Sequence, residues 1–305
     1  MGPREPRISS RGGLLPFSKG RMAQTLTWSG LGAERAYQVS LLVEREVSEA
    51  GIDELSVAQL NDLVEAVLER EDPAMLQRYR RWHRASHLDR PMVLLLGGAT
   101  GTGKSSLASE VAYRLGVSRV TSTDAVRQVM RAFFAPELMP ALHYSSFEAG
   151  DGLSVPMPDL DPGDRALHGF ILQAGQVAVG ANAIIERAVM EGLSTVVEGV
   201  HLVPGLVSAE RHQAATVVEV MLAIHDEELH QAHFFTRNFE TGGLRSMDRY
   251  LRRFGEIRRI QDYLLARAER AGIPVIDAGD PGRALGDVLD LILERTESRS
   301  EVSVG

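Results

Sequence analysis

The sequence predicts an α/β fold in which a parallel five-stranded sheet, flanked by helices, follows a small, mostly helical N-terminal domain. Two observations predict this arrangement. From Pro91 onward, short apolar runs alternate with segments of helical periodicity, which is the pattern of a parallel sheet. Before Pro91, the apolar residues recur mainly at helical spacing. A chain of 305 residues is long enough for both parts.

The first part of the chain, 1–88, is expected to hold a flexible leader and a helical module. The opening dozen residues are rich in Gly, Pro, Arg and Ser, a composition typical of loosely ordered ends. Apolar residues then recur at helical spacing in three stretches, 32–50, 56–70 and 74–87.

The second part, 89–293, carries the apolar runs that we expect to form the sheet. The expected strands are 92–96, 119–122, 194–198, 215–224 and 273–277. The stretch 135–163 is rich in Pro, Gly, Ser and Asp without a clear period, which indicates an extended substrate or lid insertion. A helix over 169–191 follows, and the polar residues 294–305 are expected to form a flexible tail.

The composition argues against several classes of function. No apolar run approaches the roughly 18 residues needed to cross a bilayer, so we expect no membrane partner. The net charge of −8 argues against a nucleic-acid partner. The chain has no cysteine, which excludes thiolate catalysis and cysteine-bound zinc. With no stretch that resembles a signal peptide, we expect a cytoplasmic protein.

A glycine-rich turn follows the first expected strand of the sheet and fits the phosphate-binding pattern G-x-x-x-x-G-K-[ST]. Such glycines let backbone N–H groups face phosphates, and the following helix adds the partial positive charge of its N-terminus. We therefore expect the fold of a P-loop NTPase that binds ATP and Mg²⁺. Lys104 should contact the β and γ phosphates, and the Ser105 hydroxyl should coordinate Mg²⁺. The residues expected to bind nucleotide are Gly98, Ala99, Thr100, Gly101, Thr102, Gly103, Lys104, Ser105 and Ser106.

The P-loop pattern does not identify the acceptor, because GTPases, motor ATPases and small-molecule kinases share it. Asp124, Arg127 and Arg131 follow the second expected strand at helical spacing, which places them on roughly one face of a helix. They would meet near the carboxyl edge of the sheet, where α/β folds bind ligands. The alternative is a helix-capping aspartate followed by two solvated arginines.

Two later segments add candidate site residues. The third expected strand ends at Glu198, beside the P-loop, where a carboxylate could hold the Mg²⁺ shell; an ordinary strand-end turn is the alternative. His201 is interpreted either as a substrate contact or as a polar rim residue. Five arginines surround Gly242 and Gly243, and a lid could bring one or two of them to the developing phosphoryl charge. The candidates among them are Arg245 and Arg249.

Four stretches of the sequence resemble the 2-phosphoglycerate kinase family of archaea and some bacteria. They are LGGATGTGKS at 96–105, the segment 119–131, VEGVHLVPG at 197–205 and RFGEIRRIQDY at 253–263. The resemblance covers most of 91–280. The run LPFSKG at 15–20, followed by helices, is similar to the ATP-cone module that precedes the kinase domain in that family. That module is regulatory in other enzymes.

The resemblance implies transfer of the γ-phosphoryl group of ATP to the 3-hydroxyl of 2-phosphoglycerate, which gives 2,3-bisphosphoglycerate. An acceptor with a carboxylate and a phosphate needs arginine partners, and Arg127 and Arg131 could supply them. Asp124 is the candidate that orients the hydroxyl and receives its proton. Glu198 either supports the metal or acts as the alternative base.

Other functions are left open by the sequence. The Ala- and Arg-rich composition looks more bacterial than archaeal, so the acceptor could instead be a related glycerate or glycosyl-glycerate. The chain could also be a nucleotide-controlled regulator in which the P-loop domain only switches. Nucleic-acid end phosphorylation is disfavoured by the acidic charge and the few aromatic residues. The expected partner is a small phosphorylated or carboxylated metabolite, and homo-oligomers are left open.

Overall fold

The chain divides into two units, Met1–His87 and Leu88–Gly305, and each has its own sheet and its own hydrophobic core. The computed structural model describes residues 6–10, 13–29, 31–86, 90–153, 162–207, 214–240 and 247–302. Among these residues, none of the helices combines the length and apolarity required to cross a membrane.

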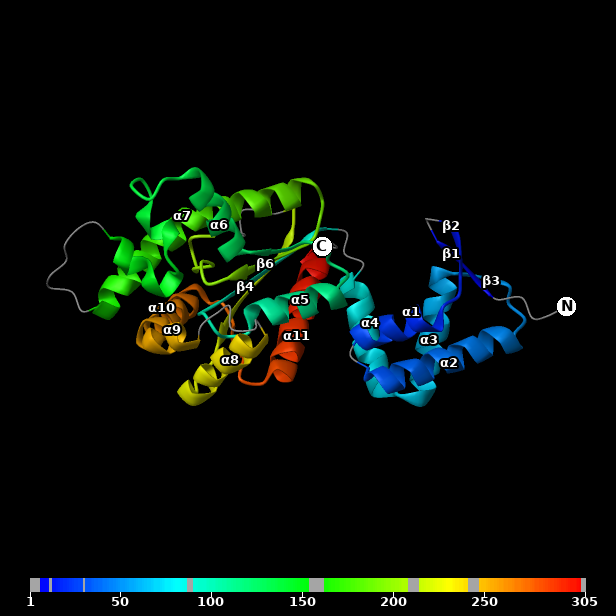
Figure 1. Ribbon diagram of the computed structural model, residues 1–305. Helices are drawn as coiled ribbons and strands as arrows, with labels where there is room; N and C mark the ends of the chain where they lie inside the picture. Colours follow the sequence, from blue (N-terminus) through cyan, green and yellow to red (C-terminus); the bar gives the residue numbers. More distant parts are fainter. Residues whose placement is uncertain are drawn as a thin grey trace. The chain divides into compact units, whose positions relative to one another are not determined.

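The first unit consists of a three-stranded sheet and helices that share one core (Figure 1). The central strand β1 pairs antiparallel with β2 and parallel with β3. Its elements are β1 (Arg7–Ser10), β2 (Gly13–Pro16), α1 (Lys19–Trp28), α2 (Ala33–Glu49), β3 (Glu54–Ser56), α3 (Val57–Glu71) and α4 (Pro73–Ser86). The three predicted helices are confirmed as α2, α3 and α4. The sheet was not predicted, because its strands have only three or four residues and no apolar alternation.

The second unit contains a five-stranded sheet of order β5-β6-β4-β7-β8, in which every pair is parallel. The predicted five-stranded parallel sheet is therefore confirmed. The strands are β4 (Met92–Gly98), β5 (Val120–Ser122), β6 (Thr195–Gly199), β7 (Thr216–Ala223) and β8 (Val275–Asp277). Every residue of β4 and β6 is buried, and β4 accordingly reads as an unbroken apolar run.

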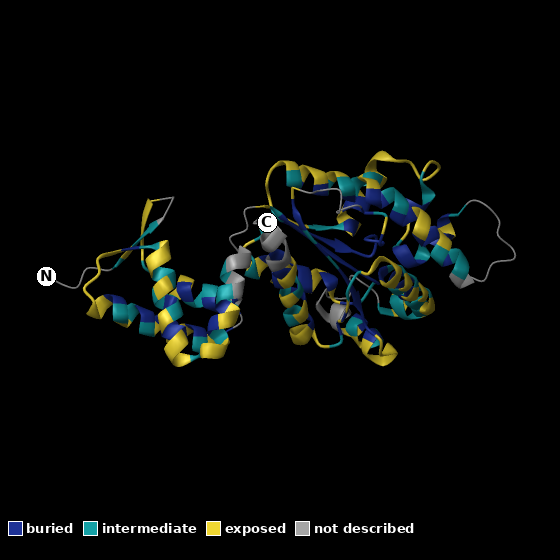
Figure 2. Ribbon diagram, turned by 180° about the vertical axis from the view of Figure 1, so that it is seen from behind, coloured by how far each residue is buried: buried dark blue, intermediate teal, exposed yellow. Residues whose placement is uncertain are grey.

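Helices cover both faces of this sheet (Figure 1). Successive residues of β4 alternate between the faces: Leu94 and Leu96 pack with α5 and α11, whereas Val93 and Leu95 pack with α7. Figure 2 shows the buried strands between helices whose outer sides are exposed. The helical elements are α5 (Lys104–Arg114), α6 (Thr123–Phe133), the 3₁₀ helices η1 (Pro140–His143) and η2 (Ser146–Gly152), α7 (Pro162–Met190), α8 (Glu227–Glu240), α9 (Met247–Arg252), α10 (Phe254–Ala271) and α11 (Pro281–Val302).

The segment expected to be an extended loop, 135–163, is folded over most of its described part. η1 and η2 are short 3₁₀ helices, which have no long period for a sequence pattern to reveal. Their glycines serve close packing: a Cβ on Gly169 of α7 would lie 2.2 Å from the backbone nitrogen of Gly150 in η2. Residues 154–161 lie outside the described part of the chain.

The C-terminal end also differs from expectation. Helix α11 continues past Glu294 to Val302, so the segment expected to be a flexible tail is largely helical. Thr296 is buried, and its hydroxyl donates to the Leu293 carbonyl at 2.7 Å. The sequence did not predict this continuation, because the polar residues after Glu294 are as typical of an exposed helix face as of a flexible tail.

Candidate active site

The P-loop connects the buried strand β4 to helix α5, as the sequence predicted. Gly101 adopts a φ of +93°, a backbone conformation that side chains with a Cβ rarely adopt. A Cβ on Gly101 would also lie 2.6 Å from the Phe234 ring of α8. The loop therefore requires glycine at this position both for its turn and for the close approach of α8.

Lys104 is the first residue of α5, and its side chain is buried within the loop. Its Nζ donates hydrogen bonds to the Ala99 carbonyl and, at 3.4 Å, to the Thr102 hydroxyl. Burial lowers the pKa of Lys104, whereas the charges of Glu198 and Asp124 raise it. Lys104 therefore interacts electrostatically with both candidate carboxylates.

Glu198 is the penultimate residue of β6 and lies in register with Leu96 of β4 and Ser122 of β5, at the carboxyl edge of the sheet. Its side chain is buried, and its Oε1 accepts a hydrogen bond from the Ser105 hydroxyl at 3.0 Å. A hydroxyl and a carboxylate are the hard oxygen ligands that Mg²⁺ takes in phosphoryl-transfer sites. The two predicted metal ligands thus lie together and fit this ion.

Asp124 lies in the first turn of α6 with its side chain 65% exposed. The helix is capped by Ser122, whose Oγ accepts from the Ala125 N–H at 3.0 Å, so the capping interpretation of Asp124 is wrong. Burial would raise the pKa of Asp124, but the charge of Arg127, its hydrogen bond to the carboxylate and the charge of Lys104 lower it. The carboxylate is therefore ionised at neutral pH and able to accept a proton.

Arg127 is buried and joins Asp124 to the insertion. Its Nε donates to Asp124 at 3.3 Å, and its Nη1 donates to the carbonyls of Leu142 and Tyr144 at 2.9 Å each. The guanidinium therefore holds the 3₁₀ segments in place as well as the carboxylate. Arg131 is exposed on the same helix and has no hydrogen bond or ion pair to Asp124.

His201 is fully buried, so the expectation that it contacts substrate is wrong. Gln173 donates its amide to the carbonyls of Ala141 and Tyr144, so its Oε1, 3.0 Å from His201 Nε2, accepts from the ring. The ring's Nδ1 then accepts from the Thr123 hydroxyl at 2.9 Å. Burial lowers the pKa of His201 to about 4, so the ring is neutral at neutral pH. Through its hydrogen bond with Thr123, the buried ring holds the first residue of α6.

Of the two candidate arginines, Arg245 and Arg249, the structure describes only Arg249. Arg245 falls within 241–246 and lies outside the described residues. Arg249 of α9 forms an ion pair with Glu148 of η2 and donates to the Ser145 hydroxyl at 3.0 Å. It therefore binds the insertion, whose Ser146 hydroxyl lies 3.5 Å from that of Thr100 in the P-loop.

Helix α8 contributes contacts to the P-loop that the sequence did not predict. His230 and His233 lie against the carbonyls of Thr100 and Gly101, at 2.8 and 3.0 Å. Phe234 packs against Gly101 from the same helix. The available signal was the spacing His-x-x-His-Phe, which puts three ring side chains on one helical face, but nothing in it names the P-loop as their partner.

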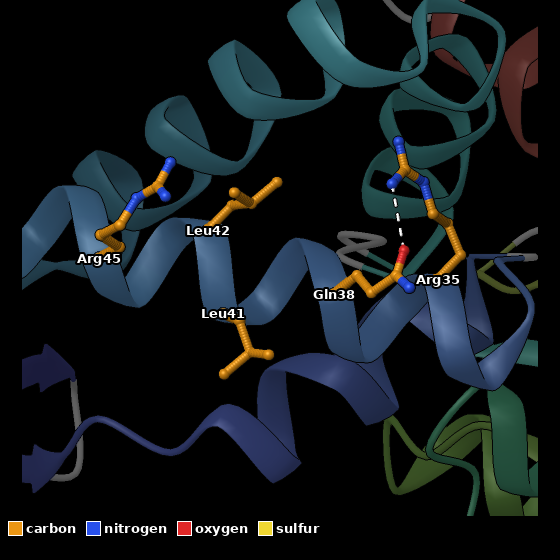
Figure 3. Close-up of a pocket in the computed structure, with 5 residues that line it drawn as sticks. All are labelled: Arg35, Gln38, Leu41, Leu42 and Arg45. Carbon is orange, nitrogen blue, oxygen red and sulfur yellow. Dashed lines mark hydrogen bonds between the residues drawn. The ribbon is translucent and has the colours of Figure 1, made fainter.

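A separate hollow of about 390 Å³ lies on helix α2 of the first unit (Figure 3). It is lined by Arg35, Gln38, Leu41, Leu42 and Arg45. Arg35 Nη1 donates to the Gln38 side chain at 3.3 Å. All of its lining residues come from α2, and it contains none of the candidate catalytic residues.

Comparisons with known proteins identify the family of this chain. The model of the ATP cone domain matches residues 7–87. A 2-phosphoglycerate kinase from Methanopyrus kandleri is 40% identical over 274 residues, which cover 90% of this chain and 83% of the relative. Those from Methanothermobacter thermautotrophicus and Pyrococcus horikoshii are each 35% identical, over 94% and 92% of this chain and 93% and 91% of their own lengths. The chain belongs to the 2-phosphoglycerate kinase family.

Proposed function

We propose that this protein transfers the γ-phosphoryl group of Mg·ATP to the 3-hydroxyl of 2-phosphoglycerate, giving 2,3-bisphosphoglycerate. The observation that carries the proposal is the convergence of the P-loop lysine, the Ser105–Glu198 pair and the Asp124 carboxylate at one sheet edge. Phosphoryl transfer requires a phosphate cradle, a metal site and a group that orients the attacking hydroxyl. The printed names of the relatives support the choice of acceptor.

The nucleotide half of the reaction is assigned to the P-loop. Residues 98–106 would surround the phosphates, with Lys104 beside the β and γ groups. Ser105 and Glu198 would hold Mg²⁺, which when bound neutralises charge on the phosphate oxygens. Such a site needs only one or two protein ligands, because water and phosphate supply the rest. The Ser105–Glu198 contact of 3.0 Å suits this assignment.

The acceptor half is assigned to α6. Asp124 would orient the acceptor hydroxyl and accept its proton, because its carboxylate is exposed and its lowered pKa keeps it ionised. Arg131 is exposed on the same helix and could bind an acceptor oxyanion. Arg127 would act on the acceptor mainly through the insertion that it holds.

We assign the kinase reaction to a domain at 89–293 and nucleotide sensing to the ATP-cone module within 1–88. The division into two units and the match to the ATP cone domain support this organisation. The acidic net charge supports a small metabolite, rather than nucleic acid, as the partner. We place the reaction in the cytoplasm.

The test is ADP release by the full chain with Mg·ATP and a panel of acceptors: 2-phosphoglycerate, 3-phosphoglycerate, glycerate and a glycosyl-glycerate. We expect release to depend on 2-phosphoglycerate and to fall by about 10²-fold or more in Asp124→Asn, with ATP affinity retained. The matched control is Asp290→Asn, which changes an exposed aspartate of α11 and should leave the rate unchanged.

Two outcomes would contradict the proposal. Preference for the glycosyl-glycerate would keep the reaction class and change the acceptor. Tight nucleotide binding without acceptor-dependent ADP release across the panel would instead favour a nucleotide-controlled regulator, as the ATP cone domain match allows.

A further inference from the structure

Two imidazoles from α8 contact two successive carbonyls of the P-loop. His230 Nε2 lies 2.8 Å from the Thr100 oxygen, and His233 Nδ1 lies 3.0 Å from the Gly101 oxygen. A carbonyl oxygen can only accept a hydrogen bond, so each of these ring nitrogens must carry a proton and donate it. The two histidines therefore hold two neighbouring peptide groups from one side.

His230 is itself held firmly. Its ring is fully buried, stacks on Phe234 at 5.6 Å between centroids, and meets Phe254 edge-on at 5.4 Å. Its second nitrogen, Nδ1, lies 3.5 Å from Arg258 Nη1, and Arg258 is fixed by the carbonyls of Ile224 and His225 at 2.6 and 3.1 Å. Burial lowers the pKa of His230 to about 4, which leaves Nδ1 free of a proton at neutral pH.

Because a peptide group is planar, a contact that holds its carbonyl also holds its N–H group. In a trans peptide, the C=O of one residue and the N–H of the next share a plane and point in opposite directions. Fixing the Thr100 carbonyl therefore fixes the Gly101 N–H, and fixing the Gly101 carbonyl fixes the Thr102 N–H. Both N–H groups point away from α8, and backbone N–H groups are the donors with which a P-loop binds phosphates.

We propose that His230 and His233 are positioning residues, which aim the Gly101 and Thr102 N–H groups at the nucleotide phosphates by holding the carbonyls of the same peptide planes. The inference rests on the kinase reaction proposed above. Donors that are oriented before the ligand arrives stabilise developing charge without the cost of reorganisation. Phe234 approaches Gly101 from the same helix, a contact that does not involve the imidazole donors.

The test compares variants that keep or remove one donor. His230→Gln places an amide N–H near the lost Nε2, and His233→Asn places one near the lost Nδ1. His230→Phe and His233→Leu keep bulk without a donor. We expect the Kd for Mg·ADP to rise about tenfold in the Phe and Leu variants and by less than about threefold in the Gln and Asn variants, in line with the loss of one buried hydrogen bond.

Calorimetric titration of the full chain supplies a readout that does not need turnover. Lys104→Ala, measured alongside, gives the nucleotide binding that remains elsewhere in the chain, and subtracting it isolates the P-loop. A thermal unfolding midpoint for each variant detects loss of fold. If His230→Phe fails to fold, the His233 pair carries the same comparison.

Steady-state kinetics adds a second readout. A positioning role raises KM for ATP and lowers kcat while KM for the acceptor changes by less than about twofold. The proposal is overturned if donor-keeping and donor-lacking variants bind Mg·ADP equally well, or if both lose affinity in proportion to a fall in unfolding midpoint. Failure of acceptor turnover with an intact donor effect on Kd would instead count against the proposed function alone.

Discussion

At the scale of single residues, the proposed metal site consists of the Ser105 hydroxyl from the first turn of α5 and the Glu198 carboxylate from β6. Glu198→Gln keeps the shape and the hydrogen bond from Ser105 but removes the charge. We expect kcat to fall by about 10²-fold and the Mg²⁺ concentration for half-maximal rate to rise, because the ion loses its anionic ligand. Mg²⁺ titration of the rate measures both. Glu110→Gln, an exposed change on α5, should have neither effect, and an unchanged Mg²⁺ requirement in Glu198→Gln would remove Glu198 from the metal site.

The buried neutral histidine His201 predicts a dependence of stability on pH. Its pKa is about 4 in the folded chain and about 6.5 when unfolded, so the unfolded state binds the proton first as the pH falls. Its contribution is complete above pH 6.5 and is lost towards pH 4, by roughly 3 kcal/mol in full. The free energy of unfolding, measured with urea, falls between pH 7 and pH 4.5. We expect this fall to be roughly 2 kcal/mol smaller in His201→Gln than in the wild type. His168→Gln changes an exposed histidine and should show the same pH dependence as the wild type. If His201→Gln also shows the pH dependence of the wild type, the prediction is contradicted.

The positions of some candidate site residues can be read from the sequence, where a local pattern sets them. Lys104 and Ser105 are fixed by the P-loop pattern, and Glu198 by its position at a strand end, because parallel strands bring their carboxyl ends to one edge. His201 failed because a strand-end histidine looks the same whether it faces solvent or a buried partner. Its partners, Thr123 and Gln173, lie on α6 and α7, far from it in sequence.

At the scale of elements, the insertion of η1 and η2 is held by two kinds of contact of unequal strength. Gln173, fully buried, donates to the Ala141 and Tyr144 carbonyls and accepts from His201. Arg249, whose side chain is half exposed, pairs with Glu148, whose side chain is 14% exposed. Gln173→Leu leaves buried polar groups without hydrogen-bond partners, and we expect it to lower the free energy of unfolding by roughly 2–3 kcal/mol. We expect Arg249→Ala to lower it by less than about 1 kcal/mol. Urea denaturation of both variants checks the order, and equal costs would contradict it.

The elements that the sequence predicted are those with a long or strong apolar pattern. The buried strand β4 reads as an unbroken apolar run, and the amphipathic helices α2 and α3 carry a helical period. Elements of three or four residues, such as β1 and η1, are too short to show a period. They form because tertiary contacts hold them, which no local pattern encodes.

At the scale of the whole molecule, each unit has its own core. One cluster of buried residues, from Met22 to Tyr79, lies wholly within the first unit, and four clusters lie within the second. A fragment of residues 88–305 should therefore fold by itself, unfold cooperatively, and bind Mg·ADP at the P-loop within about threefold of the full chain. Calorimetry and thermal unfolding test this. A fragment that is unfolded would show that the second unit depends on the first.

The proposed reaction is the phosphorylation of 2-phosphoglycerate at the P-loop site of this chain. The most direct measurement is ³¹P NMR of the reaction of the full chain with Mg·ATP and 2-phosphoglycerate, with Lys104→Ala as the control. We predict signals of 2,3-bisphosphoglycerate and ADP that grow together in equal amounts with the wild type and are absent with Lys104→Ala, because the variant lacks the ammonium beside the phosphates. ADP that appears without the bisphosphate, or product formation that survives Lys104→Ala, would contradict the claim.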